Sequence, residues 1–306
     1  MKSKFLGFEM KNPLILASGI LGVTKGSLED ICEKGAGAVI IKTLTNQERK
    51  GHPTPIMAET AYGFLNAVGY SNPGIDEGIK EFSGWKRKEP LIMSITAGNA
   101  EEFGELAGKI ENARKDGLNC HALEAVLSCP HTPGYGTLAG QGTPEATSEI
   151  TKEIKKKTTL PLIIKLSPTS QALGEIAKAA EKAGADAIDM GNTAGPGMVI
   201  DIERKAPVLS FGFGGMSGPQ IKPLMIRCVY DVYMSVKIPI IGCGGITYGK
   251  DAIEMMMAGA STIAVGTAVY YRGKEVFSLI ANEMEDWMKK NNYLKYTEII
   301  GAAHKR

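Results

Sequence analysis

Two lysines and one cysteine stand at the ends of apolar segments, and their side chains could bind a ligand or take part in catalysis. Lys42 and Lys165 each end a short apolar run, and Cys129 comes just after a third one. An ammonium group at the end of a buried strand needs an anionic partner, which an anionic cofactor or an acidic substrate would supply. A thiol in the same position could act as a nucleophile or a general base. We therefore expect these three residues to face a ligand.

A metal site is the alternative for the cysteine, and the spacing argues against it. Cys120, His121, Cys129 and His131 form an irregular set without the regular spacing of zinc ligands. We expect no metal.

Glycines follow the last two apolar runs of the chain. They stand in Gly244-Gly245 and in Gly266-Thr267, and Ser217-Gly218 lies just upstream of a helical segment. Glycine lets backbone N–H groups turn toward an anion, so these segments predict a phosphate-binding site. Tight turn packing is the alternative.

Asparagines add groups that could hold a polar ring. An amide offers a paired donor and acceptor, which fits a cyclic imide. Asn66 and Asn192-Thr193 are candidates for this role. For Asn72, which precedes Pro73-Gly74, ordinary turn chemistry is the preferred interpretation.

The elements that must position these residues follow a repeated pattern. Eight short apolar segments without period-two alternation predict strands buried on both faces. Five are 14–17, 91–96, 122–127, 162–165 and 238–242, and three more end the segments 33–42, 181–190 and 257–266, in which a helix end, a Gly-Ala turn and an apolar strand recur. Helical periodicity is found at 100–115, 144–157 after a Thr143 N-cap, 171–183, 222–236, 249–258 and 274–290. The alternation predicts a single (β/α)8 TIM barrel domain spanning residues 1–306.

A doubly wound sheet is the alternative fold. The dinucleotide fingerprint of that fold ends in a third glycine or an alanine, but the glycine-rich segments have Ser217 and Thr247 at this position, which argues against the fold. Three connections are unusually long: 43–90, 128–143 and 193–220. In a barrel all three leave strands at the same end, so we expect these long loops to roof one pocket.

Composition excludes several classes of function. The 306 residues include 35 Lys and Arg against 33 Asp and Glu, and a net charge of +2 does not indicate a nucleic-acid-binding protein. Five cysteines without a CxxC pair favour a reducing compartment. We find no signal peptide and no run of about 18 apolar residues that could span a membrane. We therefore expect a soluble cytoplasmic protein that binds neither nucleic acid nor membrane.

Six segments together resemble dihydroorotate dehydrogenase, in the expected order over nearly the whole chain. They are Asn12 to Gly19, Asn66 to Gly74, Ser128-Cys129-Pro130, Ile164 to Pro168, Gly214 to Pro219 and Gly242 to Ile246. The chain is most similar to the class 1 enzymes, and in particular to the catalytic subunit of the NAD-dependent class 1B type, because no membrane-binding helix pair precedes the barrel.

The resemblance implies an FMN-binding barrel that oxidises dihydroorotate to orotate in pyrimidine biosynthesis. A base removes the C5 proton while hydride leaves C6 for the flavin, and Cys129 maps onto that base. Lys165 would lie at the N1 edge of the flavin. The other cofactor-binding residues implied are Ala17, Ser18, Gly19, Lys42, Thr43, Asn99, Ser217 and Gly218, with Gly244, Gly245, Gly266 and Thr267 at the phosphate. The substrate-binding residues implied are Lys42, Asn66, His131, Asn192 and Thr193.

Two residues depart from the family pattern on the fourth loop. Val126 and His131 stand where the family usually has asparagines. Each lost hydrogen bond to a buried ligand costs about 1 to 3 kcal/mol unless a neighbour replaces it. The same loop is also similar to the pyrimidine domain of dihydropyrimidine dehydrogenase, so a flavoprotein acting on uracil or thymine is the alternative.

The electron acceptor stays open at this point. The chain has no cysteine cluster of ordinary iron–sulfur spacing. The class 1B resemblance implies a homodimer joined by an electron-transfer subunit with FAD and a 2Fe–2S cluster, whereas direct reoxidation by fumarate is the class 1A alternative. A phosphate-binding barrel without redox chemistry is a third hypothesis.

Overall fold

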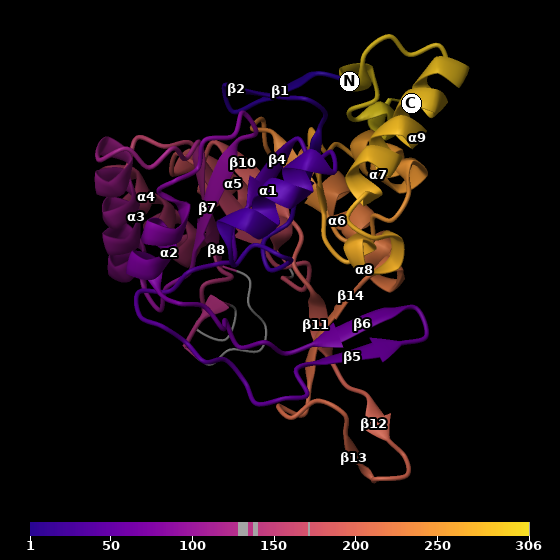
Figure 1. Cartoon of the computed structure of the whole chain (residues 1–306). Coiled ribbons are helices and arrows are strands. Elements are labelled where there is room, and N and C mark those ends of the chain that lie inside the picture. Colours follow the sequence, from indigo (N-terminus) through magenta and orange to yellow (C-terminus); the bar gives the residue numbers. More distant parts are fainter. Residues whose placement is uncertain (128–133, 137–139, 171, 306) are drawn as a thin grey trace.

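Eight parallel strands close into a barrel in the computed structural model, which describes residues 1–127, 134–136, 140–170 and 172–305 (Figure 1). The strands are β3 (Leu14–Leu16), β4 (Ala38–Ile40), β7 (Leu91–Ile95), β8 (Ala122–Val126), β9 (Leu162–Leu166), β10 (Ala187–Met190), β15 (Ile240–Cys243) and β16 (Thr262–Val265). They follow one another around the barrel in chain order, and β16 pairs with β3 to close it. The predicted (β/α)8 fold and all eight predicted strands are therefore confirmed.

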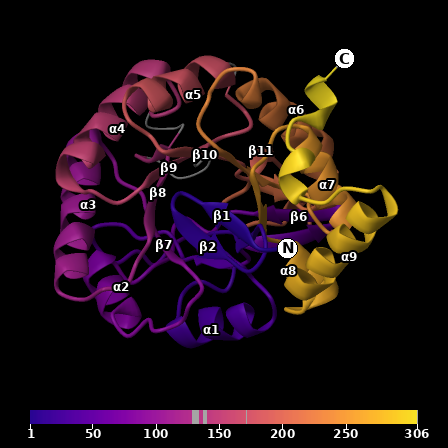
Figure 2. The ribbon, with the colours of Figure 1, turned by 90° about the horizontal axis from the view of Figure 1, so that it is seen from above.

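Helices form a ring around the strands (Figure 2). They are α1 (Lys25–Glu33), α2 (Ile75–Phe82), α3 (Ala100–Lys115), α4 (Pro144–Lys157), α5 (Leu173–Lys182), α6 (Lys222–Tyr233), α7 (Gly249–Met257), α8 (Ala268–Arg272) and α9 (Val276–Lys290). The predicted helices 100–115 and 144–157 match at both ends, and side chains cap their first turns. Asn99 accepts a hydrogen bond from the Glu102 N–H, and Thr143 accepts one from the Ala146 N–H.

The joins between helix and strand explain the recurring Gly-Ala pattern of the sequence. Gly35, Gly184 and Gly259 follow the ends of α1, α5 and α7 with φ of +113°, +105° and +126°. Glycine takes such angles without the steric cost that a Cβ brings, so the chain can reverse within a few residues. The next strand then starts beside the helix that precedes it.

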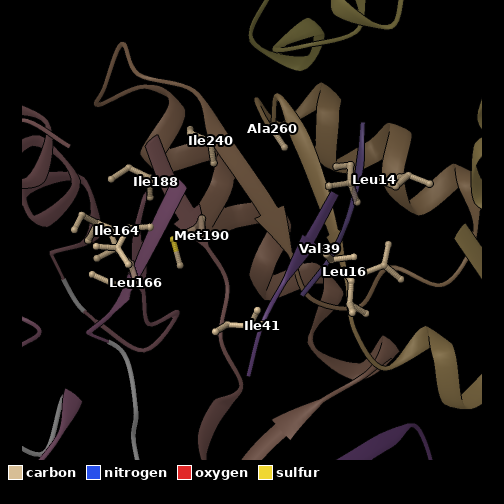
Figure 3. Packing of buried hydrophobic residues seen from close by; sticks show 14 of the residues in the cluster. Leu14, Leu16, Val39, Ile41, Ile164, Leu166, Ile188, Met190, Ile240 and Ala260 are labelled. Carbon is tan, nitrogen blue, oxygen red and sulfur yellow. The ribbon is translucent and has the colours of Figure 1, made fainter. Parts of the chain in front are cut away.

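Two separate apolar layers stabilise the barrel. The inner one fills the barrel with small and branched side chains, including Ala38, Ala122, Ile163 and Ile241. The outer one lies between strands and helices, and Figure 3 shows part of it, with Ile164 and other strand residues packed there. Side chains alternate along a strand, so residues of one strand supply both layers.

Hairpins extend both ends of the barrel. At the amino end, β1 (Ser3–Phe5) and β2 (Phe8–Met10) pair antiparallel, and Phe5 and Met10 close the inner apolar layer. At the opposite end lies a small sheet in the order β11-β14-β6-β5 (Figure 1). Its strands are β5 (Met57–Thr60), β6 (Gly63–Asn66), β11 (Ala194–Gly197) and β14 (Gly214–Ser217), and beyond it project β12 (Ile200–Asp201) and β13 (Ala206–Pro207).

This small sheet corrects the prediction for the long connections. We expected 43–90 and 193–220 to be loops, but the first holds β5, β6 and α2, and the second holds four short strands. Glycine-rich and short segments give a weak periodicity, and pairing between two distant connections is a tertiary event. α1 and α8 were likewise absent from the predicted set. No helix in the described part of the chain is both long and apolar enough to cross a membrane.

Candidate cofactor and substrate cavity

A cavity of about 230 Å³ lies where the barrel strands end. Its lining comes from segments that follow most of the barrel strands and from the small sheet at that end. Among the predicted site residues, those in the lining are Ala17, Ser18, Gly19, Lys42, Thr43, Asn66, Lys165, Asn192, Thr193, Ser217, Gly218, Gly244, Gly245, Gly266 and Thr267. Segments spread over 250 residues of sequence thus meet at one place, because parallel strands put all their carboxyl ends together.

Of the predicted site residues that the structure describes, Asn99 is not in this lining. It is exposed and uses its side chain to cap α3. Its assignment as a cofactor residue stays a prediction. Cys129 and His131 lie outside the described residues, so their roles stay predictions.

The small sheet covers the cavity and positions Asn66. This residue ends β6, where it pairs with Gly215 on one side and Met57 on the other. Phe64 and Met57 also line the cavity. The two long connections therefore place an amide and apolar side chains opposite the strand ends, as a roof would require.

The glycine segments fit the phosphate end of a ligand, but packing explains part of their composition. A Cβ on Gly245, whose φ is +77°, would lie 2.5 Å from the Lys222 Cβ, and one on Gly244 would lie 2.6 Å from the Met225 Cγ. Both contacts are to α6, so tight packing requires glycine there whatever the loop binds. Gly266 differs, because a Cβ there would lie at ordinary contact distances, 3.7 Å from the Ile20 Cγ1 and 3.8 Å from the Ala17 Cβ.

These backbone segments also lie near a helix start. Ile221, which directly precedes α6, lines the cavity together with Gly244 and Gly245. Helix N-termini favour anions through their free N–H groups and dipole. The Lys222 side chain is turned to Asp251 and Glu254, at 2.9 and 2.7 Å, so it is engaged in a separate ion pair network.

Lys165 is held by two carboxylates from the neighbouring strands. Its Nζ lies 2.8 Å from Asp189 Oδ2 on β10 and 3.6 Å from Glu124 Oε2 on β8, and it donates to the Ser18 Oγ at 3.3 Å. Lys165 is 4% exposed, and both carboxylates are 0% exposed. We expected a ligand to supply the anionic partner of Lys165, and this is corrected: the protein itself supplies two.

The three charges shift one another's pKa values. Burial alone would lower the pKa of Lys165, but the charges of Asp189 and Glu124 outweigh burial and raise it. Burial raises the pKa of Asp189 to about 8, with the nearby Glu124 adding to the effect and Lys165 opposing it. Burial would also raise the pKa of Glu124, but the Lys165 charge and hydrogen bonds from Asp189 and Ser94 hold it low.

A chain of hydroxyl groups connects this cluster to the cavity wall. The Ser94 hydroxyl donates to Glu124 Oε1 at 2.7 Å and shares a hydrogen bond of 3.0 Å with the Thr43 hydroxyl. Sequence reasoning missed Ser94, Glu124 and Asp189. The signal was present, because a carboxylate in the middle of an otherwise apolar barrel strand must face a buried cation.

The asparagines separate into two groups. Asn72 lies outside the cavity lining, and its Oδ1 accepts hydrogen bonds from the Thr45 and Gly74 N–H groups at 3.1 and 2.9 Å, which confirms its predicted turn role. Asn192 lines the cavity, and its Oδ1 accepts from the Thr193 N–H at 2.8 Å. That bond orients the amide at the end of β10.

Two further lining residues limit the chemistry available. Cys243 lies on the cavity floor, but burial raises the pKa of its thiol to about 12, so it stays protonated and is a poor base. Val126 is buried and forms a small apolar cluster with Tyr70 and Tyr135. Among the described residues, no group of three or more His, Cys, Asp or Glu side chains could hold a metal ion.

The fold and the cavity define a (β/α)8 barrel protein with a ligand site at the carboxyl ends of its strands. A family model described as dihydroorotate dehydrogenase matches residues 1–288. The chain belongs to the dihydroorotate dehydrogenase family, which places it among the oxidoreductases that act on CH–CH groups.

Relatives and a solved structure agree with this assignment. The chain is 44% identical to the dihydroorotate dehydrogenase B (NAD(+)) catalytic subunit of Pyrococcus abyssi over 305 residues, which cover 100% of this chain and 99% of the relative. It is 42% identical to the protein of the same name from Methanocaldococcus jannaschii, over 99% of this chain and 98% of the relative. The crystal structure of the Eimeria tenella enzyme in complex with ferulenol superposes with a TM-score of 0.82 at 20% identity, covering 100% of this chain and 89% of that chain. The last match supports the fold alone.

Proposed function

We propose that this chain binds FMN in the cavity and oxidises dihydroorotate to orotate for pyrimidine biosynthesis. The observation that carries the proposal is the convergence of one buried ammonium group, two amides and two glycine segments on a single cavity. A flat ring with imide groups and a phosphate tail needs such a set of donors, spread over one wall and one end.

Different residues of the chain would bind different parts of the ligand. Lys165 presents a fixed positive charge at the floor, and the Asn66 and Asn192 amides offer donors and acceptors on the walls. The backbone of Gly244-Gly245 and Gly266-Thr267 would hold the phosphate, with the start of α6 beside it. Bound FMN would supply the hydride acceptor that no amino-acid side chain can provide.

The proton would be removed by Cys129. Oxidation of dihydroorotate takes a proton from C5 and a hydride from C6, so a base is required beside the hydride acceptor. In the sequence Cys129 follows β8, two residues after the buried Leu127. The described thiol on the floor, Cys243, has its pKa raised by burial and does not suit this role.

The electrons would leave through a second subunit that carries FAD and a 2Fe–2S cluster and reduces NAD. The relatives named above are called catalytic subunits of an NAD(+) enzyme, which supports a partner for this chain too. A homodimer of the catalytic chain and a cytoplasmic location are also part of this proposal.

Anaerobic reduction tests the proposed reaction. The purified protein should be yellow, and dihydroorotate added without oxygen should bleach the visible flavin absorption. Bleaching by dihydrouracil and not by dihydroorotate would move the substrate to the uracil and thymine class. A colourless protein that takes up no FMN would favour a phosphate-binding barrel without redox chemistry.

A pair of cysteine variants tests the base. Cys129→Ala should keep its colour and FMN affinity but lose bleaching by dihydroorotate, because hydride transfer needs the proton to leave. Cys120→Ala is the matched control, since this buried cysteine precedes β8 at the other end of the same strand and should react normally. Unchanged turnover in Cys129→Ala would remove the residue from its proposed role.

A further inference from the structure

A fully buried cluster of two acids and one base lies directly beneath the cavity. Lys165 lines the cavity, whereas Glu124 and Asp189 lie behind it with no exposed surface. The three side chains come from adjacent strands β8, β9 and β10, and Lys165 is the register partner of Asp189. The strand pairing therefore fixes their separation.

The count of charges in this cluster is unbalanced. Two ionised carboxylates and one ammonium group would leave one negative charge buried in the barrel, and an uncompensated buried charge is strongly unfavourable. Two carboxylates that share a site do not both ionise readily. A retained proton removes the imbalance.

The hydrogen-bond pattern points to the same proton. Within the described part of the chain, Glu124 Oε2 and Asp189 Oδ1 accept no hydrogen bond from any donor. The two carboxyl groups nevertheless lie close together, because both contact the Lys165 Nζ, Glu124 Oε2 at 3.6 Å and Asp189 Oδ2 at 2.8 Å, and each shifts the pKa of the other. The Ser18 hydroxyl is a further donor toward Glu124, and a proton held by one carboxyl group gives the other carboxyl group a donor as well.

Among the residues that the structure describes, the remaining neighbours of the pair cannot supply the missing charge. The titratable and charged groups that face the pair are Lys165 on β9 and the Cys243 thiol on β15, which stays neutral. The other polar neighbours are the hydroxyl groups of Ser94 on β7 and of Ser18, which follows β3.

We propose that Glu124 and Asp189 are positioning residues that share one proton behind Lys165, which keeps Lys165 charged at the cavity floor while the cluster as a whole is neutral. The carboxyls fix the ammonium group so that it can donate into the cavity. Loss of the shared proton converts the cluster from neutral to singly negative, directly beneath a site that must hold anions. The inference rests on the proposed function only for the identity of those anions.

Infrared spectroscopy of the protein tests the shared proton directly. At neutral pH the wild-type protein should show the carbonyl band of a protonated carboxylic acid, and the band should fade as the pH rises through about 8, where Asp189 titrates. Asp189→Asn should lack the band, because its amide replaces the protonated acid and leaves Glu124 paired with Lys165. The control is Asp186→Asn, which removes a half-exposed carboxylate that pairs with Lys155 at 2.9 Å and should keep the band.

Orotate affinity tests the consequence for the cavity. In the wild-type protein the dissociation constant of orotate should rise roughly tenfold between about pH 7 and pH 9, the order expected for one buried charge nearby. In Asp189→Asn this rise should be absent, whereas in Asp186→Asn it should persist.

The two proposals fail in distinguishable ways. If the wild-type protein shows no carboxylic acid band at neutral pH, or if Asp189→Asn retains it, the shared proton is wrong whatever the cavity binds. If the band behaves as expected but neither FMN nor orotate binds, the cluster stands and the proposed function fails.

Discussion

Removal of the buried lysine should show how strongly the charge cluster is coupled to the fold. In Lys165→Met the side chain keeps most of its volume, but Asp189 and Glu124 lose the cation that lies 2.8 and 3.6 Å away. Breaking a buried ion pair by removing one partner costs about 3 to 5 kcal/mol, because the other partner stays buried without compensation. Since whole domains are stable by only about 5 to 15 kcal/mol, the variant should be severely destabilised at neutral pH.

A second lysine provides a matched control. Lys222 also contacts two carboxylates, Asp251 at 2.9 Å and Glu254 at 2.7 Å, but its side chain is 25% exposed. Partly exposed pairs of this kind contribute about 0 to 1 kcal/mol. Lys222→Met should therefore cost far less than Lys165→Met, although both variants remove one ammonium group from two acids.

The pH dependence separates charge from packing. The raised pKa of Lys165 means that its contribution is complete below its ordinary pKa and is lost only as the pH rises through the raised value. In Lys165→Met the pKa values of Glu124 and Asp189 rise. In acid both groups are therefore neutral, and their burial destabilises the fold little. As the pH increases they ionise, and the buried negative charge lowers the free energy of unfolding. The deficit against wild type should therefore be small near about pH 5 and largest near about pH 8.

Urea unfolding at these two pH values measures the loss of stability in Lys165→Met relative to the wild-type protein. The triple variant with Lys165→Met, Glu124→Gln and Asp189→Asn should recover much of the loss, because it buries no charge. Equal losses for Lys165→Met and Lys222→Met, or a deficit that does not change with pH, would contradict the coupling argued here.

Four further variants test other parts of the molecule. Gly245→Ala should lower both the stability and the FMN affinity, because its Cβ would lie 2.5 Å from the Lys222 Cβ. Gly266→Ala should weaken FMN binding but leave thermal unfolding nearly unchanged. Calorimetry measures the stability and a flavin titration measures the affinity. Glu111→Gln should cost about 1.5 to 3 kcal/mol in urea unfolding at neutral pH. The hydrogen bond from Arg114 lowers the pKa of Glu111 to about 2, so this difference should vanish as the pH falls from its ordinary pKa toward 2. Thr143→Ala should cost about 1 kcal/mol by removing the N-cap of α4, and an equal stability of the two proteins would show that the cap is dispensable.

The periodicity of the sequence was enough to predict the barrel. Buried strands read as continuous apolar runs, and helices such as 100–115 carry capping residues at their starts, so both signals are local. The convergence of the predicted site residues also followed from topology, because every strand of a parallel barrel ends at the same face. That the whole chain forms one domain stays a prediction.

The small sheet above the cavity could not be predicted in the same way. Its strands are at most four residues long and pair across about 150 residues of sequence, as Asn66 does with Gly215. No local pattern encodes such a partner. The capping role of Asn99 could not be predicted for a related reason: a polar residue after a strand can face a ligand or cap the next helix, and the structure shows that the Asn99 side chain caps α3.

Residue types and their order thus determined the strands, the helices and the end of the barrel at which the ligand site lies, because these depend on interactions within a few residues or on a general rule of chain topology. The tertiary structure alone decided the environment of each polar group. Lys165 could be recognised as a strand-end cation from the sequence, but its neutralisation by Glu124 and Asp189 depends on the register of three strands, and register is set by the packing of the complete barrel.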